Sequence, residues 1–245
     1  MATYNFNTSA PNNAASVAKP GSLLGKTFTY MFLFLLLTVA VTFGVSCIFQ
    51  FGIQNADVRD QAYLITMISA SITQVVLTIV IAFTSLRRGK ASVIPLVLYA
   101  VCMGVLLSSF TFFDLEWYTL GATFGIAALS FGGMALIGAR SKNATGMGLV
   151  GFGLLFGVMM ASIFNIIFAL LLPGVWLIQN IVSSILIIIA IMLITAFDVH
   201  NIKQISMRCQ ADNNLALYLA FNLYLDFIII LIHLLRLVVI FSNRR

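Results

Sequence analysis

The stretch of sequence that decides the fold is residues 215–241, which read LALYLAFNLYLDFIIILIHLLRLVVIF. A helix needs roughly 20 predominantly apolar residues to cross the hydrocarbon core of a bilayer, and this stretch exceeds that length. Asp226 and Arg236 are formally charged and lie within it. The stretch therefore predicts a transmembrane helix that carries ionisable side chains at membrane depth.

Six further apolar runs precede this one and are separated by short polar breaks. They are Phe28–Ile53, Ala62–Leu86, Ser92–Phe113, Tyr118–Gly138, Gly146–Leu172 and Val175–Phe197. The chain is 61% hydrophobic and 8% charged, whereas soluble domains are about 45–50% apolar and about 25% charged. Its mean hydropathy of +1.08 also indicates a chain that is solvated by lipid. We therefore predict an all-α membrane protein with seven transmembrane helices, antiparallel where the breaks are short.

The charges between the runs indicate an orientation. One set of breaks is basic and holds Lys19, Lys26, Arg87, Arg88, Lys90, Arg140, Lys142, Lys203 and Arg208. The alternate set holds Asp57, Asp60, Asp114 and Glu116, with Arg59, Arg244 and Arg245 as its bases. Cytoplasmic loops are enriched in Lys and Arg, so we expect a cytoplasmic N-terminus in the cell (inner) membrane. Residues 1–25 are expected to form a flexible cytoplasmic tail, and residues 26–245 the membrane domain.

Small residues at a spacing of four indicate where helices could touch. The fifth run carries Gly153, Gly157 and Ala161, and the fourth run carries Gly121 and Gly125. Such faces allow two helix backbones to approach closely in lipid. We expect ordinary helix packing contacts at both faces.

Composition and motifs disfavour several classes of function. The net charge of +6 is scattered between apolar runs and offers no basic face for nucleic acid. Cys47, Cys102 and Cys209 are widely spaced, and no Cys/His cluster in the sequence indicates zinc. The sequence has no Ser/His/Asp triad or phosphate-binding loop, and no lysine after Lys203 that could hold retinal. We therefore expect neither an enzyme nor a bound cofactor.

Polar side chains form one stripe along the last predicted helix. At about 100° per residue, one narrow sector contains Tyr218, Asn222, Asp226, His233 and Arg236. A polar stripe of this kind cannot face lipid, so we expect the helix to be central and Asn222, His233 and Arg236 to line an internal path. His233 and Arg236 lie near the outer end, where long side chains can also reach the interface, so a structural role stays open for both.

Asp198, directly after the sixth run, is a second acid within reach of the membrane. The sixth and seventh helices are sequential and are expected to be neighbours, which would bring Asp198 close to Asp226. Two carboxylates held close cannot easily both ionise, so they titrate as a unit, and when deprotonated they offer hard oxygen ligands for calcium. We predict a pH-sensing and cation-binding pair, with Arg87 and Arg88 as a possible lock. Asp198 could instead only end the sixth helix at the interface.

The two aspartate-bearing segments resemble the transmembrane Bax inhibitor motif family, in its prokaryotic, Bax inhibitor-1-like form. Residues 222–228 (NLYLDFI), continuing to LLRL at 234–237, resemble the last helix of that family. Residues 196–202 (AFDVHNI) resemble the end of its sixth helix, and the run from Gly146 (GMGLVGFG) to residues 165–168 (NIIF) resembles its fifth. The resemblance covers Gly21 to Phe241.

This resemblance implies seven helices with the last one central and wrapped by the other six. It also implies a pH-sensitive calcium leak channel gated by two aspartates, whose positions match Asp198 and Asp226. In the family an arginine near the end of the second helix holds the closed state, and Leu86 or Arg87 falls at that place here. The expected partners are the lipid bilayer, calcium ions and protons, and the resemblance specifies no partner protein.

Two other functions remain compatible with these residues. A non-conducting interaction protein that modulates a membrane protease or a stress response is allowed by analogy with the family. Two aspartates on successive helices also superficially fit an intramembrane aspartyl protease. Neither aspartate lies in a Gly-x-Gly-Asp motif, so the protease is the least favoured of the three.

Overall fold

The computed structural model describes residues 22–52, 56–88, 93–113, 117–171, 176–208 and 213–242. Side chains are described in these ranges except at 22, 56–57, 84–88, 111–113, 117, 164–171, 176–177 and 208. The predicted tail, residues 1–25, lies almost entirely outside the described residues, and the first helix begins within it at Ser22.

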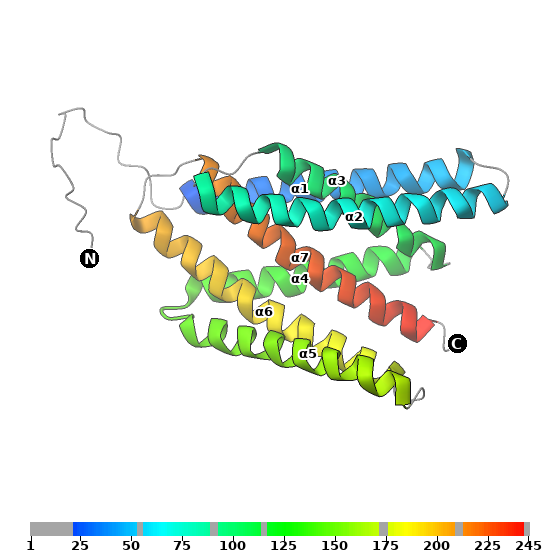
Figure 1. Cartoon of the computed structure of the whole chain (residues 1–245). Coiled ribbons are helices and arrows are strands. Elements are labelled where there is room, and N and C mark those ends of the chain that lie inside the picture. Colours follow the sequence, from blue (N-terminus) through cyan, green and yellow to red (C-terminus); the bar gives the residue numbers. More distant parts are fainter. Residues whose placement is uncertain are drawn as a thin grey trace.

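The described part of the chain is all helical (Figure 1). Its helices are α1 (Ser22–Cys47), α2 (Ala56–Arg88), α3 (Val93–Leu107), α4 (Trp117–Arg140), α5 (Thr145–Leu171), α6 (Trp176–Arg208) and α7 (Asn213–Ser242). A π-helical turn, η1 (Ile48–Gly52), continues α1, and a 3₁₀ turn, η2 (Ser108–Phe113), continues α3. All seven α-helices are long and apolar enough to cross a membrane, which confirms the predicted fold class.

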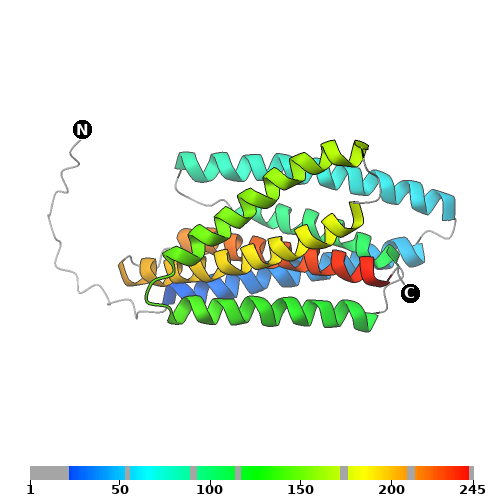
Figure 2. The ribbon, with the colours of Figure 1, turned by 90° about the horizontal axis from the view of Figure 1, so that it is seen from below.

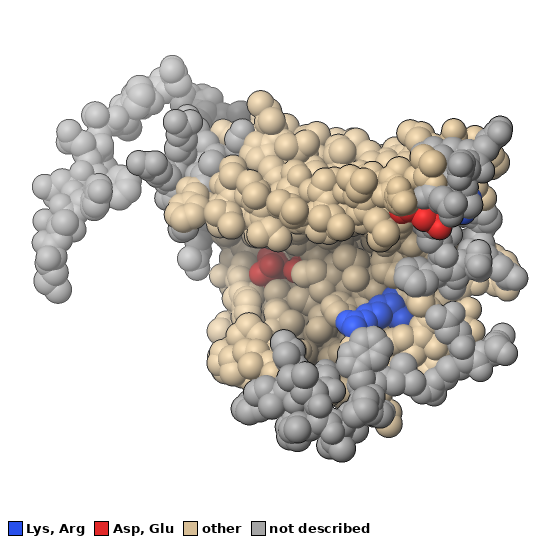
Figure 3. All heavy atoms as spheres, turned by 45° about the vertical axis from the view of Figure 1, so that its right-hand side comes forward, with Lys and Arg blue, Asp and Glu red and all other residues tan. Residues whose placement is uncertain are grey.

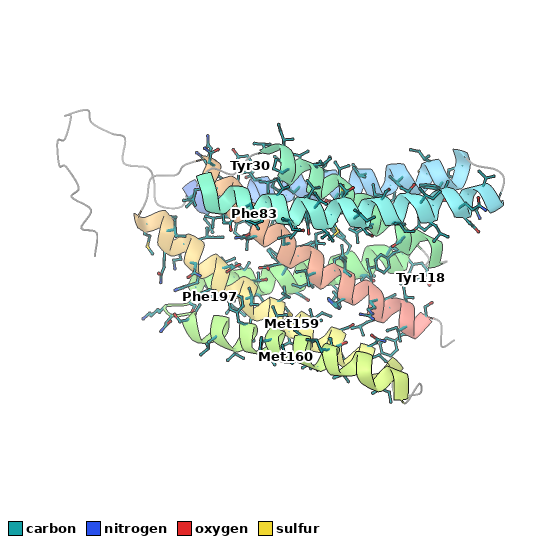
Figure 4. All side chains as sticks on the ribbon, viewed as in Figure 1. Tyr30, Phe83, Tyr118, Met159, Met160 and Phe197 are labelled. Carbon is teal, nitrogen blue, oxygen red and sulfur yellow. The ribbon has the colours of Figure 1, made fainter. Side chains whose placement is uncertain are left out.

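The outward faces of the helices are apolar, as lipid contact requires. Ile94 on α3 and Leu129 on α4 are each 78% exposed, and Phe83 on α2 is 67% exposed (Figure 4). In water such surfaces would be unfavourable, whereas in a bilayer they meet acyl chains. The chain is therefore a multi-pass membrane protein.

Helix α7 is the central element of the bundle. It packs against α1, α6 and α4, and at a few positions against α3. Figures 1 and 2 show α7 between α1 on one side and α6 on the other. The outer helices pack chiefly on other partners, α2 on α3 and α5 on α6. Helix α7 is thus central, as the sequence predicts, but the surrounding helices differ in whether they pack on α7 or on each other.

Aromatic side chains fill the contacts around α7. The rings of Tyr99 on α3 and Phe34 on α1 pack edge-on against Phe221, with centroids 5.1 Å and 6.3 Å from it. On the opposite side, Phe227 meets Phe124 and Phe131 of α4, with centroids 5.3 Å and 5.7 Å away. These two clusters bracket the segment of α7 that carries Asp226.

The glycine faces predicted for helix contact are not where the helices approach most closely. Among the described residues, a Cβ at Gly121, Gly125, Gly153 or Gly157 would meet nothing within 4 Å, so the close contacts predicted from their spacing are not formed with this part of the chain. The close approach of α4 to α6 occurs at Gly138, where a Cβ would overlap the carbonyl group of Ala196. Spacing along one helix reveals a small-residue face, but it does not reveal what lies opposite.

Helix α6 is longer than the sequence indicates. The sixth apolar run ends at Phe197, yet α6 continues to Arg208 because Val199, His200 and Ile202 are also buried. Lys203 fixes this extension by donating from Nζ to the carbonyl oxygen of Ala139 on α4, at 2.7 Å. Asp198 therefore lies within a continuous helix and does not end it.

Candidate functional site

Asp226 is buried inside the bundle and does not face lipid. Its side chain is 7% exposed, and its neighbours on α7, Tyr224 and Phe227, are 0% and 2% exposed. The carboxylate Oδ2 accepts a hydrogen bond of 3.2 Å from Oγ1 of Thr195 on α6. Asp226 thus points at the contact between α6 and α7, where the predicted pair should lie.

Asp198 lies on α6, three residues after Thr195, and is half-buried. The two carboxyl groups lie near enough for their charges to interact. Figure 3 shows an acidic group at the bottom of a hollow in the surface, and a basic group farther along the same hollow. The fold therefore brings both predicted acids to one region between the last two helices.

Phe197 separates this region from the outer helix α5. Its side chain lies on the α5 side of α6 (Figure 4), and Gly148 leaves room for it, since a Cβ there would lie 2.7 Å from the ring. The ring also packs edge-on against Phe152, with centroids 6.4 Å apart. Residues two positions apart on α6 thus make different contacts, Phe197 with α5 and Thr195 with α7.

A second buried hydrogen bond holds α7 on its other side. The hydroxyl of Tyr224 lies 2.9 Å from Oγ1 of Thr38 on α1, and Thr38 Oγ1 also lies 2.9 Å from the carbonyl oxygen of Phe34 and 3.2 Å from that of Ala100, which share its one hydrogen. Because the single hydroxyl hydrogen of Thr38 is used on these carbonyls, the Tyr224 hydroxyl is the donor to Oγ1. This hydrogen-bonded contact joins α7, α1 and α3.

The outer part of the polar stripe also faces α6. Arg236 donates from Nη2 to Oδ1 of Asn180, at 2.6 Å, and Nδ1 of His233 lies 3.4 Å from Oγ of Ser184. Asn180 and Ser184 are 7% and 0% exposed. His233 and Arg236 therefore engage buried polar groups of the neighbouring helix. Asn222, the third predicted path-lining residue, is half-buried on α7.

The predicted lock lies outside the described residues. The backbone of α2 is described as far as Arg88, but the side chains of Leu86, Arg87 and Arg88 are not. Their relation to Asp198 and Asp226 stays a prediction.

Three residues at the site were not singled out from the sequence. Thr195 and Thr38 are threonines in apolar helices, and such hydroxyls usually bond only to the carbonyl one turn earlier. His200 is a buried residue, 5% exposed, whose Nε2 lies 2.8 Å from Nε2 of Gln204. Within the described residues, its Nδ1 has no hydrogen-bond partner. The sequence pattern gives no signal for the pairings of Thr195 and Thr38, because they depend on which helix lies opposite, whereas His200 and Gln204 lie one turn apart on α6 and their spacing could have revealed the pair.

The described residues contain no group of three or more His, Cys, Asp or Glu side chains that could hold a metal ion. Calcium takes six to eight oxygen ligands, as a rule. A cation at Asp198 and Asp226 would therefore take two carboxylates from this part of the protein and the rest from water or backbone. This arrangement suits transient binding better than a permanent metal site.

The fold and the site define a seven-span helical membrane protein with two acids at the contact of its last two helices. A family model described as "Inhibitor of apoptosis-promoting Bax1" matches residues 21–244, and the chain belongs to this Bax inhibitor family. The resemblance found in the sequence is thereby confirmed. A relative from Borreliella burgdorferi, described as an uncharacterized protein, is 35% identical over 147 residues. The match spans 57% of this chain and 59% of the relative.

Proposed function

We propose that the chain is a pH-sensitive calcium leak channel of the cell membrane, with its N-terminus in the cytoplasm and Asp198 and Asp226 as its proton sensor. One observation carries the proposal. Asp226 is buried within a transmembrane helix, hydrogen bonded to α6 and within the field of Asp198. Ionisable groups inside membranes are costly, and they generally mark ion paths or proton relays.

The chemistry follows from the charge of the pair. Ionised carboxylates attract a divalent cation, and two of them bind it weakly enough for it to leave again, as conduction requires. Protonation removes this charge and changes the contact between α6 and α7. The pair then responds to pH at the place where the cation binds.

The polar contacts of α6 and α7 support a path along this seam. From the pair outward, the seam holds Ser184 with His233, and then Asn180 with Arg236. These polar groups lie at separate levels of the seam, with buried apolar residues such as Ile191 and Ile230 between them, whereas among the described residues the other interfaces of α7 hold one buried polar contact, between Tyr224 and Thr38. The α6–α7 seam is therefore the favoured route.

Calcium flux into liposomes tests the proposal. The purified full chain is reconstituted with an internal calcium dye, and uptake is measured across pH for wild type and Asp226→Asn. We expect wild-type flux to vary with pH and the variant to lose most of that variation. Asp60→Asn is the control, because Asp60 is 66% exposed, lies 3.5 Å from Arg59 on α2 and should keep the wild-type profile.

An unchanged pH profile in Asp226→Asn would refute the proposed sensor. Wild-type protein that is folded and inserted but passes no calcium at any pH would favour the non-conducting interaction protein instead. Circular dichroism and size-exclusion chromatography confirm that each variant is folded before flux is compared.

A further inference from the structure

Arg236 is a cation of α7 whose charge no described acid neutralises. It is half-buried, and the one ion pair among the described residues joins Arg59 to Asp60 on α2. Asp226, the only acid on α7, lies ten residues away, which is about 15 Å along a helix. A half-buried arginine without a negative partner is costly in a membrane protein, because water compensates its charge only in part. Arg236 would therefore gain from a bound anion.

The hydrogen bond that holds Arg236 does not neutralise it. Its Nη2 donates to Oδ1 of Asn180 on α6, at 2.6 Å, and Asn180 is an uncharged residue that is 7% exposed. A guanidinium group carries five N–H donors, so most of them remain after this bond is made. Asn180 thus fixes where the guanidinium lies and leaves donors for a ligand.

The position of Arg236 along α7 indicates the depth of this site in the bilayer. Helix α7 has 30 residues and is therefore about 45 Å long, whereas the hydrocarbon core is about 30 Å thick. A centred helix then projects by about 7 Å at each end. Arg236 lies six residues, about 9 Å, before the end of α7 at Ser242, and Asn180 lies four residues, about 6 Å, after the start of α6 at Trp176. Both residues therefore lie close to the boundary between hydrocarbon and lipid headgroups.

We propose that Arg236, held in place by Asn180, binds a phosphate group at the end of the bundle where α6 begins and α7 ends. Arginine presents paired N–H donors that match the oxygens of a phosphate, and such charge-assisted bonds are stronger than neutral ones. The phosphate present at this depth belongs to a phospholipid headgroup, and free phosphate in the adjoining water offers the same chemistry. This inference goes beyond the proposed channel and does not require calcium conduction.

Arg59 provides a comparison within the same chain. It is also half-buried, and α2 begins at the end of the bundle where α7 ends (Figure 1). Its Nε, however, lies 3.5 Å from Oδ1 of Asp60, so its charge already has an acidic partner. The two arginines agree in charge, in burial and in the end of the bundle at which they lie, and they differ in that partner. We therefore expect the phosphate at Arg236 and not at Arg59.

Native mass spectrometry of the full chain in detergent micelles tests the inference without a flux measurement. Phosphatidylglycerol is titrated into the micelles and the lipid retained by the protein is measured, with phosphatidylcholine, whose choline cation offsets its phosphate, as the reference lipid. Arg236→Gln removes the cation, Arg236→Lys keeps the charge without the paired donors, and Arg59→Gln is the matched control. Circular dichroism and size-exclusion chromatography establish that each variant is folded.

We expect Arg236→Gln to weaken the tightest phosphatidylglycerol site by about tenfold or more, because the lost hydrogen bonds involve a charged group. Arg236→Lys should lose part of this affinity, because lysine binds phosphate as a single point charge. Arg59→Gln should match wild type. If Arg236→Gln does not fold, Arg236→Lys provides the test. Affinity that is unchanged in the folded Arg236 variants overturns the inference, and so does an equal loss in Arg59→Gln.

A second arm distinguishes the two sources of phosphate. Excess inorganic phosphate is added to wild-type protein that carries phosphatidylglycerol, and sodium chloride of equal ionic strength is the reference. Lipid that stays bound in both salts assigns the site to the headgroup, whereas displacement by phosphate alone assigns it to free phosphate. Equal displacement by both salts would indicate a general screened attraction and would contradict a phosphate site.

Discussion

At the scale of single residues, the sequence reveals charge more readily than it reveals partners. Asp226 stands out because a carboxylate in an apolar run has an obvious cost. Thr195, Thr38 and Tyr224 do not stand out, because hydroxyl groups are common in transmembrane helices. Their importance lies in hydrogen bonds to other helices, which the sequence pattern does not specify. The acids could thus be predicted, whereas the groups that hold them in place could not.

The Tyr224–Thr38 hydrogen bond gives a prediction at this scale. Tyr224→Phe removes the phenol hydroxyl from a residue that is 0% exposed and leaves the acceptor Thr38 Oγ1 without its donor. We expect a loss of about 1 kcal/mol in the free energy of unfolding, measured by chemical denaturation in mild detergent micelles. Tyr30→Phe on half-buried α1 surface is the control and should change stability little. Equal stability of Tyr224→Phe and wild type would contradict a structural role for the bond.

At the scale of helices, number and type were predictable but lengths and contacts were not. The seven spans follow from hydropathy, because lipid selects long apolar helices. The extension of α6 past Asp198 was missed, because polar residues there pack against α4 instead of entering a loop. Close helix contacts were predicted wrongly at the glycine faces of α4 and α5 for a related reason. The spacing of small residues along one helix does not show whether another helix packs against them.

The contact between α4 and α6 can be tested with two alanine substitutions on one helix. Gly138→Ala places a methyl group on the carbonyl of Ala196, so we expect a loss of about 1–3 kcal/mol in stability from overpacking. Gly133→Ala is the matched control, because a Cβ there meets nothing within 4 Å in the part of the chain that the structure describes, and alanine favours a helix. Thermal unfolding in detergent should fall for the first and stay level or rise for the second. A Gly138→Ala protein as stable as wild type would rule out this close approach.

At the scale of the whole molecule, the proposed orientation depends on charges between the helices. The geometry of the site does not indicate the orientation, because α6 and α7 pack together in the same way whichever end of the bundle faces the cytoplasm. The distribution of Lys and Arg is therefore the main guide to which end of the α6–α7 seam meets the cytoplasm.

Labelling of single cysteines tests this orientation in intact cells. In a background where Cys47, Cys102 and Cys209 are replaced by serine, Asp60→Cys and Lys142→Cys each place one exposed thiol at opposite ends of the bundle. We expect a membrane-impermeant maleimide to label Asp60→Cys from outside, and Lys142→Cys only after permeabilisation. The reverse pattern would place the N-terminus outside the cell.

Tyr224 and Asp226, whose hydrogen bonds join α7 to different helices, lie two residues apart in sequence and on opposite sides of the helix. Tyr224 ties the helix to α1 and α3 through groups that hold no titratable proton near neutral pH, and Asp226 ties it to α6 through one that does. Acidification would thus change the charge on one flank of α7 and leave the other flank unchanged. Any movement that follows should displace α6, together with α5 and the end of α4 that packs on it at Gly138, relative to α1, α3 and α7.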